Sequence, residues 1–529
     1  MKLVSKSNYT AAGRREKGHP RVNSVNSSVT IDASKIIGPV NRRLFGGFVE
    51  HMGRGVHGGI YDPSHSTSDE DGFRQDVIEL VKELGMTVFR YPGGNFVSGF
   101  RWEDSVGPRE TRPRRLNLPW HSTETNAFGL HEFMSWVGKV NGEAMLAVNL
   151  GTRGIPEAVD LLEYSNVPGG TELSERRRTN GSYEPFDIRM WCLGNELDGP
   201  WQLGQMTADE YGRIATRTAK ALRRVDPTLE LVVCGSSGSW MPTFGPWERT
   251  VLGHSYEDVD YISCHAYYEP KNGDMRSYLA SGASMETYIL DVVRHADAVR
   301  DELGSSKTLQ LSFDEWNIWY HSRMVGSLPT GIANWPEAPA ISEDDYTVAD
   351  GVVLGDLLIS LLTHVDRVTT ACLAQVVNVI APIAAPTDAP AWRKTTFYPF
   401  SLTARFAKGD SLDTVVESPK VATEQHGDVD VVHAAAVNDA ESGGVVVFVV
   451  NRSLEEAVTT TIELTGFEGS ARVLEAVTLS DADMMATNSA DAPERIVPQV
   501  NGSARAGIRS VVIELPPVSW TMVRIDVTG

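Results

Sequence analysis

Eight short apolar runs, separated by segments of helical period, limit the possible folds more than any other feature of the chain. Segments with a helical apolar period lie between most of the runs, including 73–85, 130–140, 208–225, 285–304 and 348–365. The runs themselves are 42–51, 86–95, 144–151, 188–196, 229–237, 259–268, 309–317 and 368–378. This alternation predicts an α/β fold, a (β/α)8 TIM barrel with enlarged loops. A doubly wound open sheet is the alternative.

A second domain is expected because 529 residues exceed the roughly 250 to 300 at which a single core stops growing. After about residue 400 the chain becomes rich in Val and Thr, in short alternating runs that are typical of an antiparallel β-sandwich. We therefore expect a barrel over 41–400 and a C-terminal sandwich over 401–529. Residues 28–40 have the sandwich pattern and should join it, and 1–27 should form a flexible N-terminal extension.

The charge and the cysteines exclude several classes of protein. A formal net charge of −21 opposes general affinity for nucleic acid or anionic membranes, so neither is expected as a partner. No apolar run approaches the roughly 18 residues of a membrane span, and the first 20 residues lack the apolar region of a secretory signal. A cytoplasmic protein is expected. Reduced core thiols are expected at Cys192, Cys234, Cys264 and Cys372, which form no CxxC pair.

Polar side chains gather where six of the predicted strands end. Satisfied core polar groups could explain one or two of them, but six strands doing the same indicate a site. The carboxyl ends of barrel strands converge on the face where active sites are built. The residues are Glu50, Arg90, Asn95, Asn195, Glu196, His265, Tyr267, Asp314, Glu315 and Gln375.

Two of these carboxylates, Glu196 and Glu315, suit glycoside hydrolysis. That reaction needs one carboxyl group to protonate the leaving oxygen and another to attack the anomeric carbon or activate water. Structural readings stay open at this point: pairing with Arg90 for Glu315, helix capping for Asp314, and a satisfied structural group for Glu196. For Glu50 the structural alternative is an ion pair with Arg54.

Other patterns in the sequence are less informative about function. The glycine-rich stretches "GRGVHGGI" and "PGGN" lack the features of a phosphate loop or a dinucleotide fingerprint. His51, His57 and His65 lie close in sequence, but no accompanying ligand cluster has metal spacing. No metal and no cofactor are expected. The "RRR" at 176–178 and the acidic "SEDDY" at 342–346 are interpreted as solvated loops.

Five stretches, "GGFVEHMGRGVHGGIYDP", "FRYPGGNFVSGFRWEDSVGP", "WCLGNELDGPW", "LSFDEWNIWYH" and "CLAQVVNVIAPI", closely resemble the α-L-arabinofuranosidases of glycoside hydrolase family 51. The resemblance extends over nearly the whole chain after about residue 28, and the family fold is a barrel plus a sandwich-type domain. It implies a retaining double displacement with Glu196 as general acid/base and Glu315 as nucleophile.

The resemblance also assigns the surrounding residues. Arg90 would keep Glu315 ionised and Tyr267 would orient it, while His265 supports the site. Trp120 and Trp319 would present aromatic surfaces to the sugar or the leaving group, with simple loop packing as their alternative. Ala266 replaces the Gln that many relatives carry, which puts any contact from that side chain in doubt. Sugar binding would fall to Glu50, Asn95, Asn195 and Gln375.

The implied function is an exo-acting enzyme that releases terminal arabinofuranose from short arabinose-containing oligosaccharides, working as a homo-oligomer such as a hexamer. Two alternatives remain from the sequence. One is a related retaining glycosidase on the same barrel, a β-xylosidase or an endoglucanase, because fold does not fix specificity. The other is a carbohydrate-binding protein without catalysis, against which the presence of both Glu196 and Glu315 argues.

Overall fold

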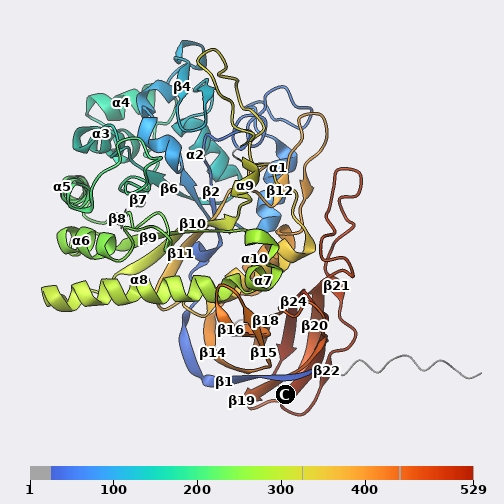
Figure 1. Ribbon diagram of the computed structural model, residues 1–529. Coiled ribbons are helices and arrows are strands. Elements are labelled where there is room, and N and C mark those ends of the chain that lie inside the picture. The colour runs from blue at the N-terminus through green and yellow to red at the C-terminus, as the bar shows by residue number, and fades with distance from the viewer. Residues whose placement is uncertain (1–24, 325, 440–442, 528–529) are drawn as a thin grey trace, which may run out of the picture.

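Eight parallel strands close into a barrel in the computed structural model, which describes residues 25–324, 326–439 and 443–527. Each strand pairs with the next along the barrel, and the last pairs with the first, so the open-sheet alternative is excluded and the predicted barrel is confirmed. All eight predicted runs supply a strand (Figure 1). The strands are β2 (Gly46–Phe48), β3 (Val88–Tyr91), β6 (Glu143–Ala147), β7 (Met190–Cys192), β8 (Glu230–Val233), β9 (Tyr261–Tyr268), β10 (Gln310–Ile318) and β11 (Val368–Ala374).

Helices surround the barrel, and their apolar faces join one large core with the strands. Five lie where the apolar period predicts them: α1 (Gln75–Leu84), α2 (Leu130–Lys139), α5 (Ala208–Val225), α8 (Ser281–Leu303) and α10 (Val348–Leu362). The structure adds α3 (Ile155–Asn166), α4 (Glu172–Thr179), α6 (Pro246–Ser255), α7 (Met275–Leu279), α9 (His321–Met324) and α11 (Phe397–Phe406).

The interpretation of "RRR" as a solvated loop was wrong. These residues lie in α4, and Arg177 is completely buried. Its guanidinium donates to backbone carbonyl oxygens of five residues, including Tyr164 and Val167, at 2.6 to 3.3 Å. A buried cation is tolerated when its donors are satisfied in this way.

The second domain is one continuous ten-stranded sheet whose two halves share a core. Val29 and Ile462 come from one half, and Val447 and Val523 from the other. The sheet is antiparallel except where β1 pairs with β19 in parallel; no hairpin joins these two strands, so nothing local fixes their direction. The order is β21 (Gln499–Val500), β20 (Arg472–Leu479), β24 (Ser519–Asp526), β18 (Gly444–Asn451), β17 (Val432–Asp439), β14 (Asp410–Glu417), β1 (Val25–Pro39), β19 (Val458–Thr465), β23 (Ser510–Leu515) and β22 (Arg505–Ala506).

Among the described residues, three small two-stranded sheets lie outside the barrel and the large sheet: β4 (Arg115–Asn117) with β5 (Ser122–Glu124), β12 (Ile383–Ala384) with β13 (Trp392–Arg393), and β15 (Lys420–Thr423) with β16 (Gly427–Asp430). Figure 1 places β4 at the end of the molecule opposite the sandwich. Of the predicted N-terminal extension, residues 1–24 lie outside the described residues.

Helix α10 joins the two domains. All of its residues are buried, and it contacts β17, β18 and β24 of the sandwich as well as helices of the barrel. A helix that is apolar on every side must be covered on every side. The interface also holds a buried ion pair between Asp356 of α10 and Arg452, which follows β18.

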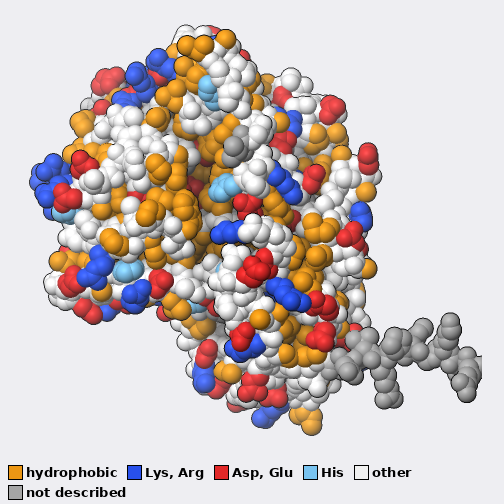
Figure 2. Space-filling view, viewed as in Figure 1, with side chains coloured by type: hydrophobic (Ala, Val, Ile, Leu, Met, Phe, Trp, Pro, Cys, Tyr) orange, Lys and Arg blue, Asp and Glu red, His pale blue; other side chains and the backbone are white. Residues whose placement is uncertain are grey.

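Across the described residues, none of the helices combines the length and the apolar character needed to cross a membrane. Figure 2 shows Lys, Arg, Asp and Glu interspersed over the visible face, with no extended field of one sign. All four cysteines are free and buried, as expected.

Candidate active site

The carboxyl ends of the barrel strands form a pocket of about 320 Å³. Eight of the predicted site residues line it: Glu50, Asn95, Trp120, Glu196, Tyr267, Glu315, Trp319 and Gln375. Three more, Arg90, Asn195 and His265, are buried beside it and bond to its carboxylates or to one another. The structure therefore brings every residue of the predicted site together.

Glu315, on β10, is held through both carboxylate oxygens. Arg90 donates from Nη1 to Oε1 at 2.7 Å, and the Tyr267 hydroxyl donates to Oε2 at 2.8 Å. Arg90 is buried and Tyr267 is partly buried. Desolvation raises the pKa of Tyr267 well above its ordinary value, so this tyrosine keeps its proton and donates it. Glu315 is thus fixed in orientation at the wall of the pocket.

Glu196, which follows β7, has different surroundings. Its Oε1 bonds to Nδ1 of His265 at 2.8 Å, and its Oε2 accepts from Nε1 of Trp201 at 2.7 Å. Burial raises the pKa of Glu196, and the charge of Glu315 adds to this, while the hydrogen bonds from His265 and Trp201 act in the opposite sense. A carboxyl group that retains its proton toward neutral pH is suited to donate it.

The backbone at Glu196 is unusual, with φ of +45°. This left-handed region costs a residue with a side chain about 1 to 3 kcal/mol, and such positions cluster at functional sites. The turn lets the Glu196 carboxyl reach His265 on β9 instead of continuing along the strand direction.

The two glutamates are close together. One oxygen of Glu196, one ring nitrogen of His265 and one oxygen of Glu315 all lie within 4.8 Å of one another. Carboxyl groups about 5 to 5.5 Å apart are typical of retaining glycosidases, whereas inverting enzymes need about 6.5 to 9.5 Å to admit a water. The spacing fits direct attack on the sugar by one carboxylate.

His265 bonds to two carboxyl groups of the site, those of Glu196 and Asp314. Burial lowers its pKa, but the charge of Glu315 and the hydrogen bonds to Asp314 and Glu196 outweigh this and raise the pKa to about 10. His265 therefore carries a proton on both nitrogens at neutral pH, and it donates to Glu196 and, at 3.2 Å, to Asp314.

Glu50, after β2, accepts two hydrogen bonds at Oε1, from the Phe96 backbone N–H and from Nε1 of Trp120, each at 2.9 Å. Burial and the charge of Glu315 raise the pKa of Glu50 to about 8 despite these donors. The glycines of "PGGN" pack against it, since a Cβ at Gly93 would lie 2.5 Å from Cβ of Glu50. These glycines permit close packing around the carboxyl group.

Three amide side chains lie in or beside the pocket. Asn195 accepts from Nη2 of Arg90 at 2.9 Å, and Gln375 accepts from the Glu50 backbone N–H at 3.3 Å. Oδ1 of Asn95 is buried and has no hydrogen-bond partner among the described residues. An unpaired buried acceptor costs about 1 to 3 kcal/mol, so it marks a place where a ligand hydroxyl would be stabilising.

The two tryptophans line the pocket rather than serving only as loop packing. Trp120 lies in the turn of the β4–β5 hairpin and donates to Glu50. Trp319 follows β10, stands edge-on to Tyr267 with ring centroids 4.9 Å apart, and donates to the Ser342 hydroxyl at 3.0 Å.

Two structural alternatives from the sequence were wrong. Arg54 pairs with Glu343 and leaves Glu50 to the pocket. Asp314 caps no helix; it bonds to His265 and lies 3.5 Å from Nε of Arg90.

Two clusters of ligand atoms that are not visible from spacing in the sequence are brought together by the fold. Ligand atoms of His51, His57 and Glu124 lie within 4.8 Å of one another, as do those of Glu196, His265 and Glu315. In the first cluster both histidines bond directly to Glu124, which comes from β5 and is far from them in sequence.

Sequence reasoning missed Trp201 and the Phe96 N–H, the donors to Glu196 and Glu50. Trp201 stands in the same quoted stretch as Glu196, but only the turn that follows the left-handed residue brings the indole back to the carboxyl group. The indole of Trp201 is 41% exposed and stacks on Trp240, with ring centroids 5.9 Å apart. These two rings extend the site outward from Glu196.

Comparisons with known proteins agree with this geometry. Residues 80–281 match the family model described as "Alpha-L-arabinofuranosidase 1 domain", and 314–519 match "Alpha-L-arabinofuranosidase C-terminal domain". The chain is 54% identical to an exo-α-(1→6)-L-arabinofuranosidase of Bifidobacterium longum, covering 94% of this chain and 97% of the relative. It is 53% identical to an intracellular exo-α-(1→5)-L-arabinofuranosidase of Streptomyces lividans, covering 94% and 74%.

Among solved structures, a family 51 α-L-arabinofuranosidase from Bifidobacterium longum superimposes with a TM-score of 0.91 at 46% identity, covering 95% of this chain and all of that one. Identity at this level over nearly the full length of both proteins goes beyond a shared fold. The chain therefore belongs to the α-L-arabinofuranosidases of glycoside hydrolase family 51.

Proposed function

We propose that this chain is a retaining, exo-acting α-L-arabinofuranosidase in which Glu315 is the nucleophile and Glu196 the general acid/base. The observation that carries the proposal is the contrast between two close carboxyl groups: Glu315 is fixed by Arg90 and Tyr267, whereas burial raises the pKa of Glu196. Pairs of carboxyl groups with such different environments divide into nucleophile and acid.

The reaction proceeds in two displacements. In the first, an oxygen of Glu315 bonds to the anomeric carbon, the glycosidic C–O bond breaks, and the Glu196 proton passes to the leaving oxygen. In the second, water attacks the anomeric carbon, Glu196 takes its proton, and the bond to Glu315 breaks. Two inversions leave the anomeric configuration unchanged.

The other polar groups suit a furanose with several hydroxyls. With a pKa of about 8, Glu50 keeps its proton at neutral pH and can donate from it to a sugar hydroxyl. The unpaired Oδ1 of Asn95 can accept from another hydroxyl. A site with fixed donors and acceptors rejects the wrong sugar, because the buried groups are then left unpaired.

The substrates proposed are short arabinose-containing oligosaccharides met inside the cell. The names of relatives support exo action on arabinofuranosides inside the cell, since they include exo-α-(1→5)-L-arabinofuranosidases described as intracellular. A leaving group would lie on the side of Glu196, where Trp201 and Trp240 offer ring faces to a sugar. On the family resemblance alone, we also propose a homo-oligomer.

A comparison of aryl glycosides tests the substrate assignment. Turnover of an aryl α-L-arabinofuranoside should exceed that of an aryl β-D-xylopyranoside by several orders of magnitude, because the wrong ring leaves Glu50 and Asn95 unpaired. Comparable rates would favour the β-xylosidase alternative and sink the arabinofuranosidase assignment. Binding of both sugars without turnover of either would favour the protein without catalysis.

A further inference from the structure

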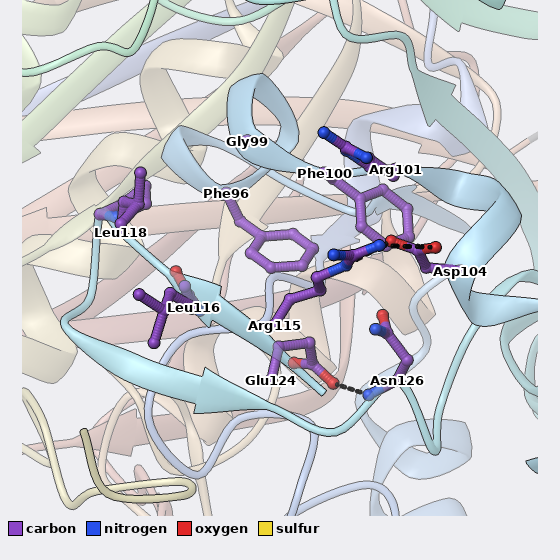
Figure 3. Close-up of a pocket in the computed structure, with 12 residues that line it drawn as sticks. Phe96, Gly99, Phe100, Arg101, Asp104, Arg115, Leu116, Leu118, Glu124 and Asn126 are labelled. Atoms are coloured by element: carbon purple, nitrogen blue, oxygen red, sulfur yellow. Dashed lines mark hydrogen bonds and ion pairs between the residues drawn. The ribbon is translucent and has the colours of Figure 1, made fainter. Parts of the chain in front are cut away.

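A second pocket, of about 480 Å³, lies behind the β4–β5 hairpin. One wall is the segment after β3, with the rings of Phe96 and Phe100, and the other is the hairpin, with Arg115, Asn117 and the residues after it. Figure 3 shows the Arg115 side chain lying across this pocket toward Asp104, with both rings beside it. None of the contacts proposed above for catalysis lies within it.

The pocket offers an unused acceptor. Asn117 is 4% exposed, its Nδ2 donates to the His51 carbonyl at 2.6 Å, and its Oδ1 has no hydrogen-bond partner in the described part of the chain. A buried carbonyl oxygen in this state loses about 1 to 3 kcal/mol relative to a paired one. A hydroxyl donor entering the pocket would remove that cost.

The pocket also offers a donor. Arg115 gives Nε and Nη2 to the carboxylate of Asp104, at 2.8 and 3.3 Å, which fixes the guanidinium over the opening. Its Nη1 carries two N–H groups and bonds to nothing among the described residues. Arg115 and Asn117 both line the pocket from the same strand, β4.

The rest of the lining mixes apolar side chains with polar ones, among them Arg101, Glu124 and Asn126. The Phe96 and Phe100 rings lie with centroids 5.0 Å apart and an interplanar angle of 37°, and His51 stacks behind Phe96 at 4.6 Å. Leu116 and Leu118, each about half exposed, lie at the outer edge of the lining. Aromatic faces accept the C–H face of a sugar ring, while a fixed donor and acceptor accept its hydroxyls.

We propose that this pocket is a second saccharide-binding site, which holds one neutral sugar unit apart from the unit being cleaved. The free Oδ1 of Asn117 and the free Nη1 of Arg115 match hydroxyl chemistry. The two carboxylates of the lining are already paired, Asp104 with Arg115 and Glu124 with two histidines, which favours a neutral ligand.

The site shares its walls with the catalytic pocket. The Phe96 backbone N–H and the Trp120 indole both hold Glu50, while the Phe96 ring and the residues just before Trp120 line the second pocket. A sugar bound there therefore packs against the two elements that fix Glu50. That the ligand is a saccharide is inferred from the lining of this pocket. L-arabinose is chosen as the probe because of the proposed function.

Crystals of the full-length enzyme soaked over a series of L-arabinose concentrations test the site, because electron density scores the two pockets separately. In the wild type, density for one sugar ring should appear within hydrogen-bond distance of Nη1 of Arg115 and Oδ1 of Asn117. In Arg115→Ala the concentration needed to fill the second pocket should rise at least tenfold.

The matched control is Arg213→Ala. Arg213 on α5 forms the same exposed two-bond pair with Asp209, at 2.7 and 3.1 Å, but lines neither pocket. This variant should fill both pockets as the wild type does. A second pocket that holds only water at every concentration, or that fills equally in Arg115→Ala, overturns the inference. A sugar in the second pocket with an empty catalytic pocket would instead count against the proposed function.

Discussion

Glu196 and Glu315 show how environment alone separates two chemically identical side chains. Glu196 lies between a cationic histidine and an indole, in a buried position that raises its pKa. The site holds four carboxyl groups, those of Glu50, Glu196, Asp314 and Glu315, and two cations, Arg90 and His265. The raised pKa values of Glu50 and Glu196 favour their neutral forms, so the charges of the site come closer to balance.

The pKa of Glu196 predicts the alkaline limb of the pH profile. The proposed acid must be protonated in the free enzyme, so kcat/KM should fall as pH rises through its raised pKa, above the ordinary range of a glutamate. In Glu196→Ala, kcat/KM for an activated aryl arabinofuranoside should lose the part of this limb that Glu196 causes and keep only the fall from deprotonation of Glu50, whose pKa is about 8.

Substitution of His265 sharpens the test. His265→Gln keeps a hydrogen-bond donor but removes the positive charge, which acts to lower the pKa of Glu196. The alkaline limb should then move to higher pH. An unchanged limb in Glu196→Ala would show that another group titrates there.

At the residue scale, the sequence was most informative where a polar side chain directly follows a strand. Glu50, Glu196, Glu315 and Gln375 could be placed on one face because the barrel geometry brings strand ends together. Contacts made by loops, such as that of Trp201 with Glu196, could not, because loop geometry depends on turns that the residue pattern does not specify.

Helix α10 illustrates prediction at the scale of one element. Its apolar period predicted a helix. It did not predict that a second domain covers the outer face of this helix. Conversely, α4 was missed because its charged sequence has almost no apolar period, and what fixes it is the network of carbonyl oxygens around Arg177.

Gly355 in α10 tests how closely the domains pack. A Cβ there would lie 2.1 Å from Cδ1 of Trp520 on β24, a contact that requires a shift of helix or strand. Gly355→Ala should lower the free energy of unfolding by about 1 to 3 kcal/mol, as overpacked cores do. Chemical denaturation followed by tryptophan fluorescence measures it.

Gly253→Ala in α6 is the matched control, since a Cβ at Gly253 meets no atom within 4 Å. Replacing a helical glycine in open space should stabilise the protein by about 0.5 to 1 kcal/mol. If Gly355→Ala were as stabilising as this control, the tight contact between α10 and Trp520 would be wrong.

At the scale of the whole molecule, the barrel and the sandwich are joined through buried charges. Asp356 on α10 accepts from Arg452 at 2.6 Å and bonds to His433 of β17 at 2.8 Å. Asp356 and Arg452 are almost fully buried, and His433 is partly buried. The sequence pattern indicated two domains but not this network, because the partners are 77 and 96 residues apart.

Removal of one partner should be costly. Arg452→Met leaves Asp356 with less compensation in a buried interface, and breaking such a pair costs about 3 to 5 kcal/mol. Arg276→Met breaks the exposed pair with Glu455, which also joins barrel to sandwich, and should cost no more than about 1 kcal/mol. Equal losses of unfolding free energy in the two variants would contradict the importance of the buried network.

The stereochemistry of azide products tests the central claim, the division of roles between Glu315 and Glu196, most directly. An activated aryl α-L-arabinofuranoside is incubated with each alanine variant and azide, and the anomeric configuration of the arabinosyl azide is read by NMR. Glu196→Ala still forms the Glu315 adduct, so azide should displace it and give the retained α product. Glu315→Ala has a vacated face, so azide should attack the substrate directly and give the inverted β product. The opposite pairing of variants and products would contradict the assignment of both residues.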